Sequence, residues 1–349
     1  MGARGCANVC APWSIRERRG ESMSAASRAF GRHPWKASAE QMALWPSVSG
    51  NAINGLGEPR ARRPSAIYWH APDATPHGPL QRWFIARTTS RVRAAREERQ
   101  RAIEESVAPL APAPEEKTPE EWSRAVKQAA GDAGAEAVGI ARVKPEWVFE
   151  GHEVKQTWVV VLAFAHDWDA LRTAPAETAA EEVILQYARG IRTAKKVAGF
   201  LRARGHEAHA HGGPMAFPLL LIPAAIEAGL GELGKHGSLI HRTLGSNFRL
   251  ACVLTDVPLV ADGPDDFGAD DFCTRCRACE DACPPEAIVP VKQLVRGKER
   301  WYVDFDRCLP FFNEHQGCAI CLAVCPWNHP GVAGTLVRKL AVRRARPTR

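Results

Sequence analysis

The chain has 349 residues, 45% of them hydrophobic and 24% charged, and a formal net charge of +7, which suits a globular protein of about two or three domains. No apolar run reaches the roughly 18 residues of a membrane-spanning helix, and no apolar segment follows Arg18-Arg19 to complete a twin-arginine export signal. We therefore expect a cytoplasmic protein without a membrane span, whose cysteines are ligands or catalysts rather than disulfides.

The first 115 residues show little hydrophobic periodicity and are rich in Arg, Ser, Pro and Ala. We predict that residues 1–115 are a poorly ordered or family-variable N-terminal region with a linker, and that translation starts at Met1 or Met23. Residues 91–106 have the composition of a charged helix, and the run APLAPAP at 108–114 is typical of a proline-rich linker.

Regular structure is predicted from Thr118 onward, where Thr118, Pro119 and Glu121 form a capping-box pattern that starts a helix. Further helices are expected over 177–204, with a break near Gly190, and over 218–228. Buried strands are expected at 137–141, 157–165, 207–211 and 249–255. Because helices alternate with strands, we predict an α/β (α+β) layered domain over residues 116–261.

Eight of the eleven cysteines lie between positions 273 and 325. The first four have the spacing C-x2-C-x2-C-x3-C-P, which is typical of bacterial ferredoxins with two [4Fe–4S] clusters. The second four have the spacing C-x9-C-x2-C-x3-C-P, in which Cys308 must reach its cluster from a separate loop. We predict a small ferredoxin-like domain over 262–335 with two clusters. Zinc is the alternative, but four-cysteine zinc sites do not usually have this triple run.

The fourth cysteine of each ferredoxin motif binds the cluster of the other motif. This crossing assigns to one cluster the ligands Cys273, Cys276, Cys279 and Cys325. It assigns to the other cluster the ligands Cys283, Cys308, Cys318 and Cys321. Cys252, in an apolar strand, is expected to be a small buried hydrophobe.

A basic tail is predicted over residues 336–349. We favour a solvated terminus over a nucleic-acid site, which stays an open alternative.

Several motifs stand in an order that resembles the corrinoid-dependent reductive dehalogenases and their relatives, the epoxyqueuosine reductases. They are AGLGELGKHGSLI at 228–240, FRL at 248–250, the two cysteine motifs, FFNEHQGCAIC at 311–321 and CPWN at 325–328. The resemblance runs from about Glu121 to Lys339. It implies a base-off cobalamin in a nitroreductase-like α/β domain close to one cluster.

The glycines of the first motif have their own interpretation. Gly229, Gly231, Gly234 and Gly237 allow backbone to approach a flat, bulky ligand closely. A tight connection between helix and strand is the simpler alternative, but with the resemblance we favour a cofactor loop.

The resemblance also implies a catalytic tyrosine that donates a proton, with a basic residue beside it. Matched residue by residue, these are Tyr187 and Arg249. A guanidinium next to a phenol favours the phenolate and lowers its pKa. Alternatively, Tyr187 is a half-buried helical tyrosine, and Arg249 binds a cofactor propionamide or pairs with an acid.

The implied activity is a cobalamin-dependent reduction that replaces a carbon–halogen bond of a small-molecule substrate by carbon–hydrogen. Electrons would come from an external ferredoxin or flavodoxin through the two clusters. One alternative is an epoxyqueuosine reductase-like enzyme acting on tRNA, and another is a non-enzymatic electron-transfer protein. The epoxyqueuosine reductases use an aspartate at a place that falls near Met215, and no acid is present between His211 and Ile226, which disfavours the tRNA reaction.

Overall fold

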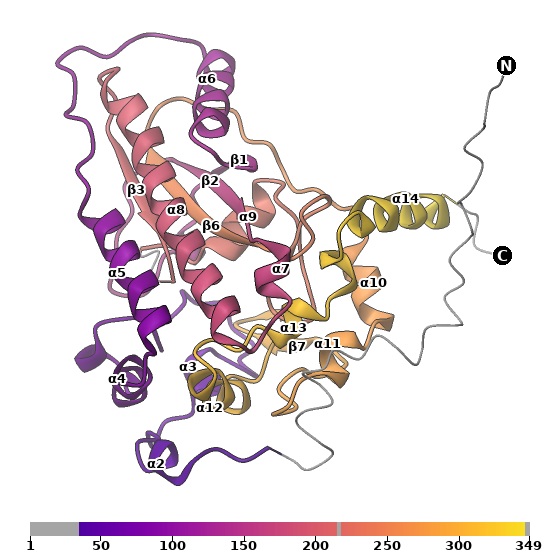
Figure 1. The fold of residues 1–349 in the computed structure, drawn as a ribbon. Coiled ribbons are helices and arrows are strands. Elements are labelled where there is room, and N and C mark those ends of the chain that lie inside the picture. Colours follow the sequence, from indigo (N-terminus) through magenta and orange to yellow (C-terminus); the bar gives the residue numbers. More distant parts are fainter. Residues whose placement is uncertain (1–34, 215–217, 346–349) are drawn as a thin grey trace, which may run out of the picture.

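A four-stranded antiparallel sheet lies at the centre of one half of the molecule (Figure 1). Its strands, in the order β1-β2-β6-β3, are β1 (Ala137–Arg142), β2 (Trp158–Ala165), β6 (Phe248–Thr255) and β3 (Ala208–Gly212). The computed structural model describes residues 35–214 and 218–345. Met23 and Met215, which enter the predictions above, lie outside the described residues.

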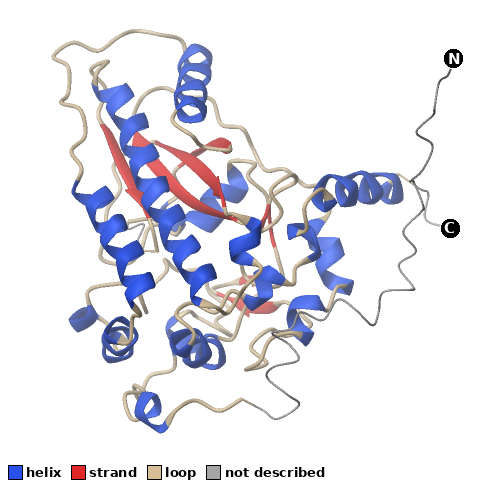
Figure 2. Cartoon of the chain, viewed as in Figure 1, coloured by secondary structure: helices blue, strands red, loops and turns tan. Residues whose placement is uncertain are grey.

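Both faces of the sheet are covered, as Figure 2 shows. Side chains of β2 alternate between two cores, with Val160 and Leu162 on one side and Val159 and Val161 on the other. On the first side pack α6 (Pro119–Asp132) and α8 (Glu177–Arg202). On the second pack η2 (Pro145–Trp147) and α9 (Leu221–Glu227). The mixed helix and strand architecture is confirmed.

Local signals in this half are largely confirmed. The capping box at Thr118 is present, with both reciprocal hydrogen bonds to Glu121. The break expected near Gly190 is wrong, because α8 is one continuous helix. A Cβ at Gly190 would lie 3.3 Å from Phe164 and 3.4 Å from Ala251. The glycine therefore lets the helix lie close to β2 and β6 rather than interrupting it.

Residues 35–115 contain helical elements, so regular structure begins earlier than the predicted start at Thr118. They contain α2 (Ala39–Met42), α3 (Gly50–Ile53), η1 (Pro72–Ala74), α4 (Gly78–Ala86) and α5 (Ser90–Glu104). Helix α5 packs along α8 through Ala102, Ala188 and Ile191. The segment was misjudged because its helices are short or, like α5, highly charged, and because they pack on distant parts of the chain.

The cysteine-rich half contains mostly short elements. They are α10 (Ala269–Arg275), α11 (Ala278–Asp281), β7 (Gln293–Val295), β8 (Lys298–Arg300), α12 (Phe305–Glu314), α13 (Ile320–Ala323), η3 (Pro326–Asn328) and α14 (Val332–Arg344). The expected tail from 336 belongs instead to α14, where Leu340 is buried. Arg344 pairs with Asp266 and Asp271, so the free-tail prediction is wrong for residues 336–345. The other domain boundaries stay predictions.

A hairpin of β4 (Glu232–Leu233) and β5 (Leu239–Ile240) connects the two halves. The Glu232 carboxylate accepts backbone N–H groups of residues 267–270 at 2.8–3.1 Å, at the start of α10. These donors are ones that a helix start leaves without partners. The carboxylate therefore fixes the hairpin to the cysteine-rich half.

In the described ranges, none of the helices is both long and apolar enough to cross a membrane. The short helix α7 (Trp168–Leu171) precedes α8 and packs against it.

Candidate functional site

The eight thiols lie in two groups, which their mutual electrostatic interactions define. One group contains Cys273, Cys276, Cys279 and Cys325. The other contains Cys283, Cys308, Cys318 and Cys321. This is the grouping that the crossed assignment predicts, although the ligand roles themselves stay a prediction. Cys279 also interacts with Cys321, so the two groups are neighbours.

Burial makes these thiols costly to ionise without a partner. It raises the pKa of Cys273 to about 11 and that of Cys308 and Cys321 to about 12. It also raises the pKa of Cys279, Cys283, Cys318 and Cys325. A bound iron–sulfur cluster supplies the positive charge that stabilises thiolates in such surroundings. Within the described ranges, no three His, Cys, Asp or Glu side chains are placed to hold a single metal ion.

The backbone before α13 is strained. Gln316, Gly317, Cys318 and Ala319 all have positive φ, between 32° and 116°. A non-glycine residue in this conformation costs about 1–3 kcal/mol and persists only where its surroundings impose it. Cys318 is one of the grouped thiols, so a cluster bound here would be such a surrounding. The donor set and this loop both fit an iron–sulfur cluster.

Lys235 is buried beside the first thiol group, with 2% of its surface exposed. Its ammonium donates to the carbonyl of Cys276 at 2.9 Å and lies 3.4 Å from the Glu280 carboxylate. Its backbone N–H donates to the Cys273 thiol. Glu280 is shared with Arg277. The hairpin therefore places a positive charge next to this group of cysteines.

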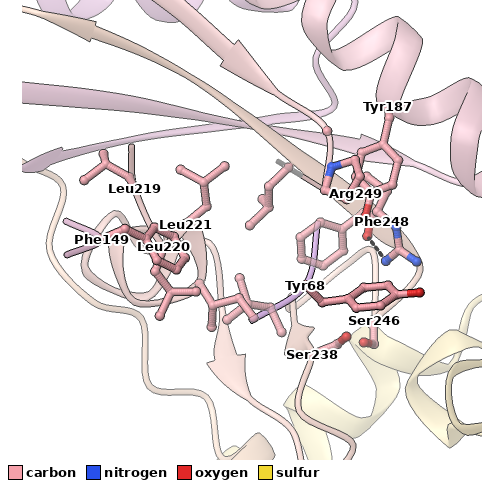
Figure 3. A pocket seen from close by; sticks show the side chains of 15 residues that line it. Tyr68, Phe149, Tyr187, Leu219, Leu220, Leu221, Ser238, Ser246, Phe248 and Arg249 are labelled. Carbon is pink, nitrogen blue, oxygen red and sulfur yellow. Dashed lines mark hydrogen bonds between the residues drawn. The ribbon is translucent and has the colours of Figure 1, made fainter. Parts of the chain in front are cut away.

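A cavity of about 290 Å³ lies between the sheet and the hairpin. Figure 3 shows its two ends. The apolar end is formed by Phe149 and residues 219–221, and the polar end by Tyr187, Arg249, Tyr68 and Ser246. The volume is at the small end of the range for ligand pockets, which begins near 300 Å³. It suits a small organic molecule.

Tyr187 and Arg249 are brought together at the polar end. The Arg249 guanidinium lies 5.6 Å from the centroid of the Tyr187 ring. One of its terminal nitrogens donates to the carbonyl of Phe248 at 3.3 Å. A cation in this position is attracted to the ring face. The predicted pair thus lies at a cavity, and the sequence contained no sign of this cavity.

Several buried polar atoms near this end have no hydrogen-bond partner among the described residues. They include the Ser246 hydroxyl, the Arg249 Nε, the Asn247 Oδ1 and both ring nitrogens of His166. Burial and the charge of Arg249 hold the pKa of His166 well below its usual value, so its ring is neutral at pH 7. Buried polar atoms normally find partners. These atoms suit the amide side chains at the edge of a corrinoid, but the cavity of about 290 Å³ would hold only part of so large a molecule.

The four predicted cofactor glycines do not line this cavity. A Cβ at Gly231 would lie 2.2 Å from the carbonyl oxygen of Ile240, and one at Gly229 would lie 2.8 Å from that of Gly263. A Cβ at Gly234 would meet His236 and Ile240, and one at Gly237 would meet Val303. Each of the four thus lies close to another part of the protein, and their role at a cofactor stays a prediction. Of the same motif, Ser238 and Leu239 line the cavity instead.

Tyr68 is a wall residue that sequence patterns did not indicate, because it lies in the region expected to be poorly ordered. Its hydroxyl donates to Asn313 at 2.8 Å. Ser246 was also missed, and its backbone N–H donates to the side chain of Asn328, three residues after Cys325. Both walls are therefore bonded directly to the cysteine-rich half. The CPWN motif containing Asn328 was the one available signal.

Comparison with known proteins gives one family model, described as a 4Fe-4S dicluster domain, which matches residues 272–329. The tetrachloroethene reductive dehalogenase of Dehalobacter restrictus is 35% identical over 209 residues, covering 56% of this chain and 37% of the relative. That of Sulfurospirillum multivorans is 29% identical over 276 residues, covering 63% and 54%. An epoxyqueuosine reductase of a Synechococcus species is 41% identical over 132 residues, covering 33% and 37%. The chain thus spans about half the length of these curated relatives, or less.

Solved structures show the same relationship. The catabolic reductive dehalogenase NpRdhA in complex with 3-bromo-4-hydroxybenzoic acid matches with a TM-score of 0.70 and 22% identity, covering 86% of this chain and 46% of that one. A reductive dehalogenase whose structure is said to suggest a mechanism for B12-dependent dehalogenation matches with a TM-score of 0.67 and 22% identity, covering 87% and 48%. The fold is shared, and the resemblance expected from the motifs is confirmed.

Proposed function

We propose that this chain, a homologue of the reductive dehalogenases with a 4Fe–4S dicluster domain, is an oxidoreductase that removes halogen from a small organic molecule. The observation that carries the proposal is the cavity at which Tyr187 and Arg249 meet, whose walls are hydrogen-bonded to the cysteine-rich half through Ser246 and Tyr68. A proton donor, Tyr187, and the cysteine-rich half that would deliver electrons thus lie next to the same cavity.

The cofactors of this proposal are two [4Fe–4S] clusters and a base-off corrinoid. The two thiol groups would each hold one cluster. The α/β half would be the nitroreductase-like corrinoid domain, and the unpartnered atoms of Ser246, Asn247 and Arg249 would contact the corrinoid or the substrate. A bound corrinoid would supply the cobalt chemistry that cleaves the carbon–halogen bond.

The reaction balances as R–X + 2 e⁻ + H⁺ → R–H + X⁻. The two electrons would come from an external donor of the ferredoxin or flavodoxin class, one at a time through the clusters. The proton would come from the Tyr187 hydroxyl, with the Arg249 cation stabilising the resulting phenolate. The apolar end at Phe149 and Leu219–Leu221 would exclude water from the substrate.

The test is anaerobic reconstitution with iron, sulfide and cobalamin, followed by electron paramagnetic resonance and halide release. We expect signals of two clusters and of bound cobalt. With titanium(III) citrate as reductant, we expect halide release from 3-bromo-4-hydroxybenzoic acid or from tetrachloroethene. The first compound is bound in a related structure and the second is named as the substrate of a relative.

Three outcomes would contradict the proposal. Clusters without bound corrinoid would leave an electron-transfer protein. Conversion of epoxyqueuosine in tRNA without halide release would place the chain with its other relatives. Bound corrinoid with no halide from either class of substrate would remove the dehalogenase assignment.

A further inference from the structure

Three arginines surround the two tyrosines at the polar end of the cavity. Arg249, on β6, lies over the Tyr187 ring. Arg99, on α5, interacts electrostatically with Tyr187 as well. Arg96, one helical turn earlier on α5, interacts with Tyr68 and with Arg99. Arg249 lines the cavity itself, whereas Arg96 and Arg99 are linked to it through the two lining tyrosines.

These guanidiniums lack the acidic partners that their neighbours have. On the same helix, Arg91 pairs with Glu181 and Arg101 with Glu98. In the part of the chain that the structure describes, no carboxylate forms a salt bridge with Arg96, Arg99 or Arg249. Arg96 instead contacts the Thr88 hydroxyl and the face of Phe84. Arg96 and Arg99 also repel each other.

Burial adds to this electrostatic cost. Desolvation lowers the pKa of Arg99, and it lowers that of Arg96 to about 10. Both side chains are still charged at neutral pH. Both side chains are partly buried, and a charge that has lost part of its water shell is destabilising unless it finds a partner. Such a cluster next to a cavity is stabilised most simply by an anion that enters the cavity.

Two further observations point to a ligand at this position. Gly213 lines the cavity, and a Cβ there would lie 3.8 Å from Arg99 Nε. Arg99 therefore lies beside a residue of the cavity wall. Ser246 also lines the cavity, is 2% exposed, and its buried hydroxyl has no partner among the described residues.

We propose that Arg249 and Ser246, which line the cavity, and Arg99, which lies beside Gly213 in its wall, form a subsite for an oxyanion carried by the ligand of this cavity, with Arg96 adding positive charge one helical turn from Arg99. Guanidinium groups bind carboxylate and phosphate oxygens through paired, charge-assisted hydrogen bonds. Two sources have this chemistry: the carboxylate of an aromatic substrate and the phosphodiester of a corrinoid side chain. The choice of these two sources rests on the proposed function.

The first experiment uses the unmodified chain with reconstituted clusters and measures affinity by anaerobic titration calorimetry. One ligand pair is 3-bromo-4-hydroxybenzoic acid and its uncharged amide. The other is cobalamin and cobinamide, which lacks the phosphate. We expect the anionic member of at least one pair to bind about tenfold tighter or more, since one hydrogen bond to a charged group contributes roughly 1.5–3 kcal/mol. The preference should shrink as salt is added.

The second experiment identifies the groups responsible. Arg99→Met and Arg96→Met keep the length of the apolar stem and remove the charge. Each should reduce the preference, in the acid pair if the substrate is the source and in the corrinoid pair if the phosphate is. The control is Arg93→Met, an exposed arginine of the same helix, which should leave both preferences unchanged.

Equal affinities within both pairs for the unmodified chain would overturn the subsite, even if the variants failed to fold. So would a preference that neither variant reduces. Because affinity is measured without turnover, the proposed function can fail separately. An anion preference without halide release would remove the dehalogenase assignment and keep the subsite, and halide release without a preference would do the reverse.

Discussion

The close approach of Tyr187 and Arg249 depends on the nearby Gly190. Gly190, one turn after Tyr187 on α8, lies against Phe164 and Ala251 of the sheet. Its missing side chain lets α8 approach β6, where Arg249 starts the strand with Phe248. The position of a phenol relative to a guanidinium is thus set by close packing of a helix on a sheet.

Tyr187→Phe should reduce halide release by about 10² to 10⁴-fold, because the variant loses the proton donor and retains the ring. Iron content and the cobalt signal should be unchanged. The measurement is halide release per bound cobalt under saturating reductant.

The matched control for this substitution is Tyr302→Phe. Tyr302 bonds to Asn51 and Asn54 rather than lining the cavity, and its variant should retain turnover. Loss of clusters in the Tyr187 variant would mean that the residue has a structural role instead.

Lys235→Met should make the midpoint potential of one cluster more negative. Reduction adds an electron to a cluster, and the nearby buried ammonium stabilises that added negative charge. Redox titration followed by electron paramagnetic resonance should show one cluster shifted and the other unchanged.

Lys292→Met is the control. The Lys235 and Lys292 ammonium groups lie 5.2 Å and 5.6 Å from the centroid of the Trp301 ring, but Lys292 is partly exposed and paired with Asp270. It should shift neither potential appreciably. If Lys235→Met moved neither cluster, or moved both equally, the ammonium would not be acting on one cluster.

At the scale of elements, the β4–β5 hairpin depends on its backbone conformation. Gly231→Ala should lower the free energy of unfolding by about 2 kcal/mol or more. The residue has φ of 134°, and the new Cβ would lie 2.2 Å from the carbonyl oxygen of Ile240. Thermal unfolding under argon measures the effect.

Gly131→Ala provides the comparison, since it lies exposed on α6 with open space around its Cβ position. It should raise stability by about 0.5–1 kcal/mol, as expected for alanine in a helix. Equal effects of the two substitutions would show that the hairpin glycine tolerates a side chain.

Elements with strong local signals could be predicted from sequence. The β2 strand is a continuous apolar run, and α6 begins with a complete capping box. Gly190 was misjudged because a glycine in a helix is equally compatible with a break and with close packing, and only the sheet beside it distinguishes them. The same holds for Gly231, whose neighbour Ile240 belongs to the next strand.

At the scale of the whole molecule, Asn313 connects the first described helices to the cysteine-rich half. Its side chain is fully buried, accepts from Tyr68 and donates to Gln41. Asn313→Leu should cost about 2–4 kcal/mol, because two buried polar partners are left without hydrogen bonds. Hydrogen exchange should then increase in residues 35–90.

Gln128→Leu removes an exposed amide that bonds only to Asp132 on its own helix, and it should leave exchange in residues 35–90 unchanged. Unaltered exchange in the Asn313 variant would show that other contacts are sufficient to hold these helices in place. Examples are the hydrogen bonds of Asn51 with Asp304 and Tyr302.

The eight cysteines of the candidate site could be predicted because their spacing is local. Tyr187 and Arg249 required the resemblance, since no short-range pattern marks them. Tyr68 and Arg99 could not be predicted, because their places at or near the cavity depend on the fold. Tyr68 is bonded to Asn313 and Arg99 interacts electrostatically with Tyr187, and each partner is more than 80 positions away.

The bond between Gln41 and Asn313 joins positions 272 residues apart. A ribosome adds about 5–20 residues per second, so the earlier side chain is made on the order of tens of seconds before its partner. The helices around Gln41 therefore leave the ribosome before α12, the segment on which they pack, has been synthesised. They can close over the molecule only when α12, with Cys308, has been synthesised. A late segment of the described chain thus completes the packing of an early one, and a nascent chain stalled before α12 would expose an unpacked surface to chaperones and proteases.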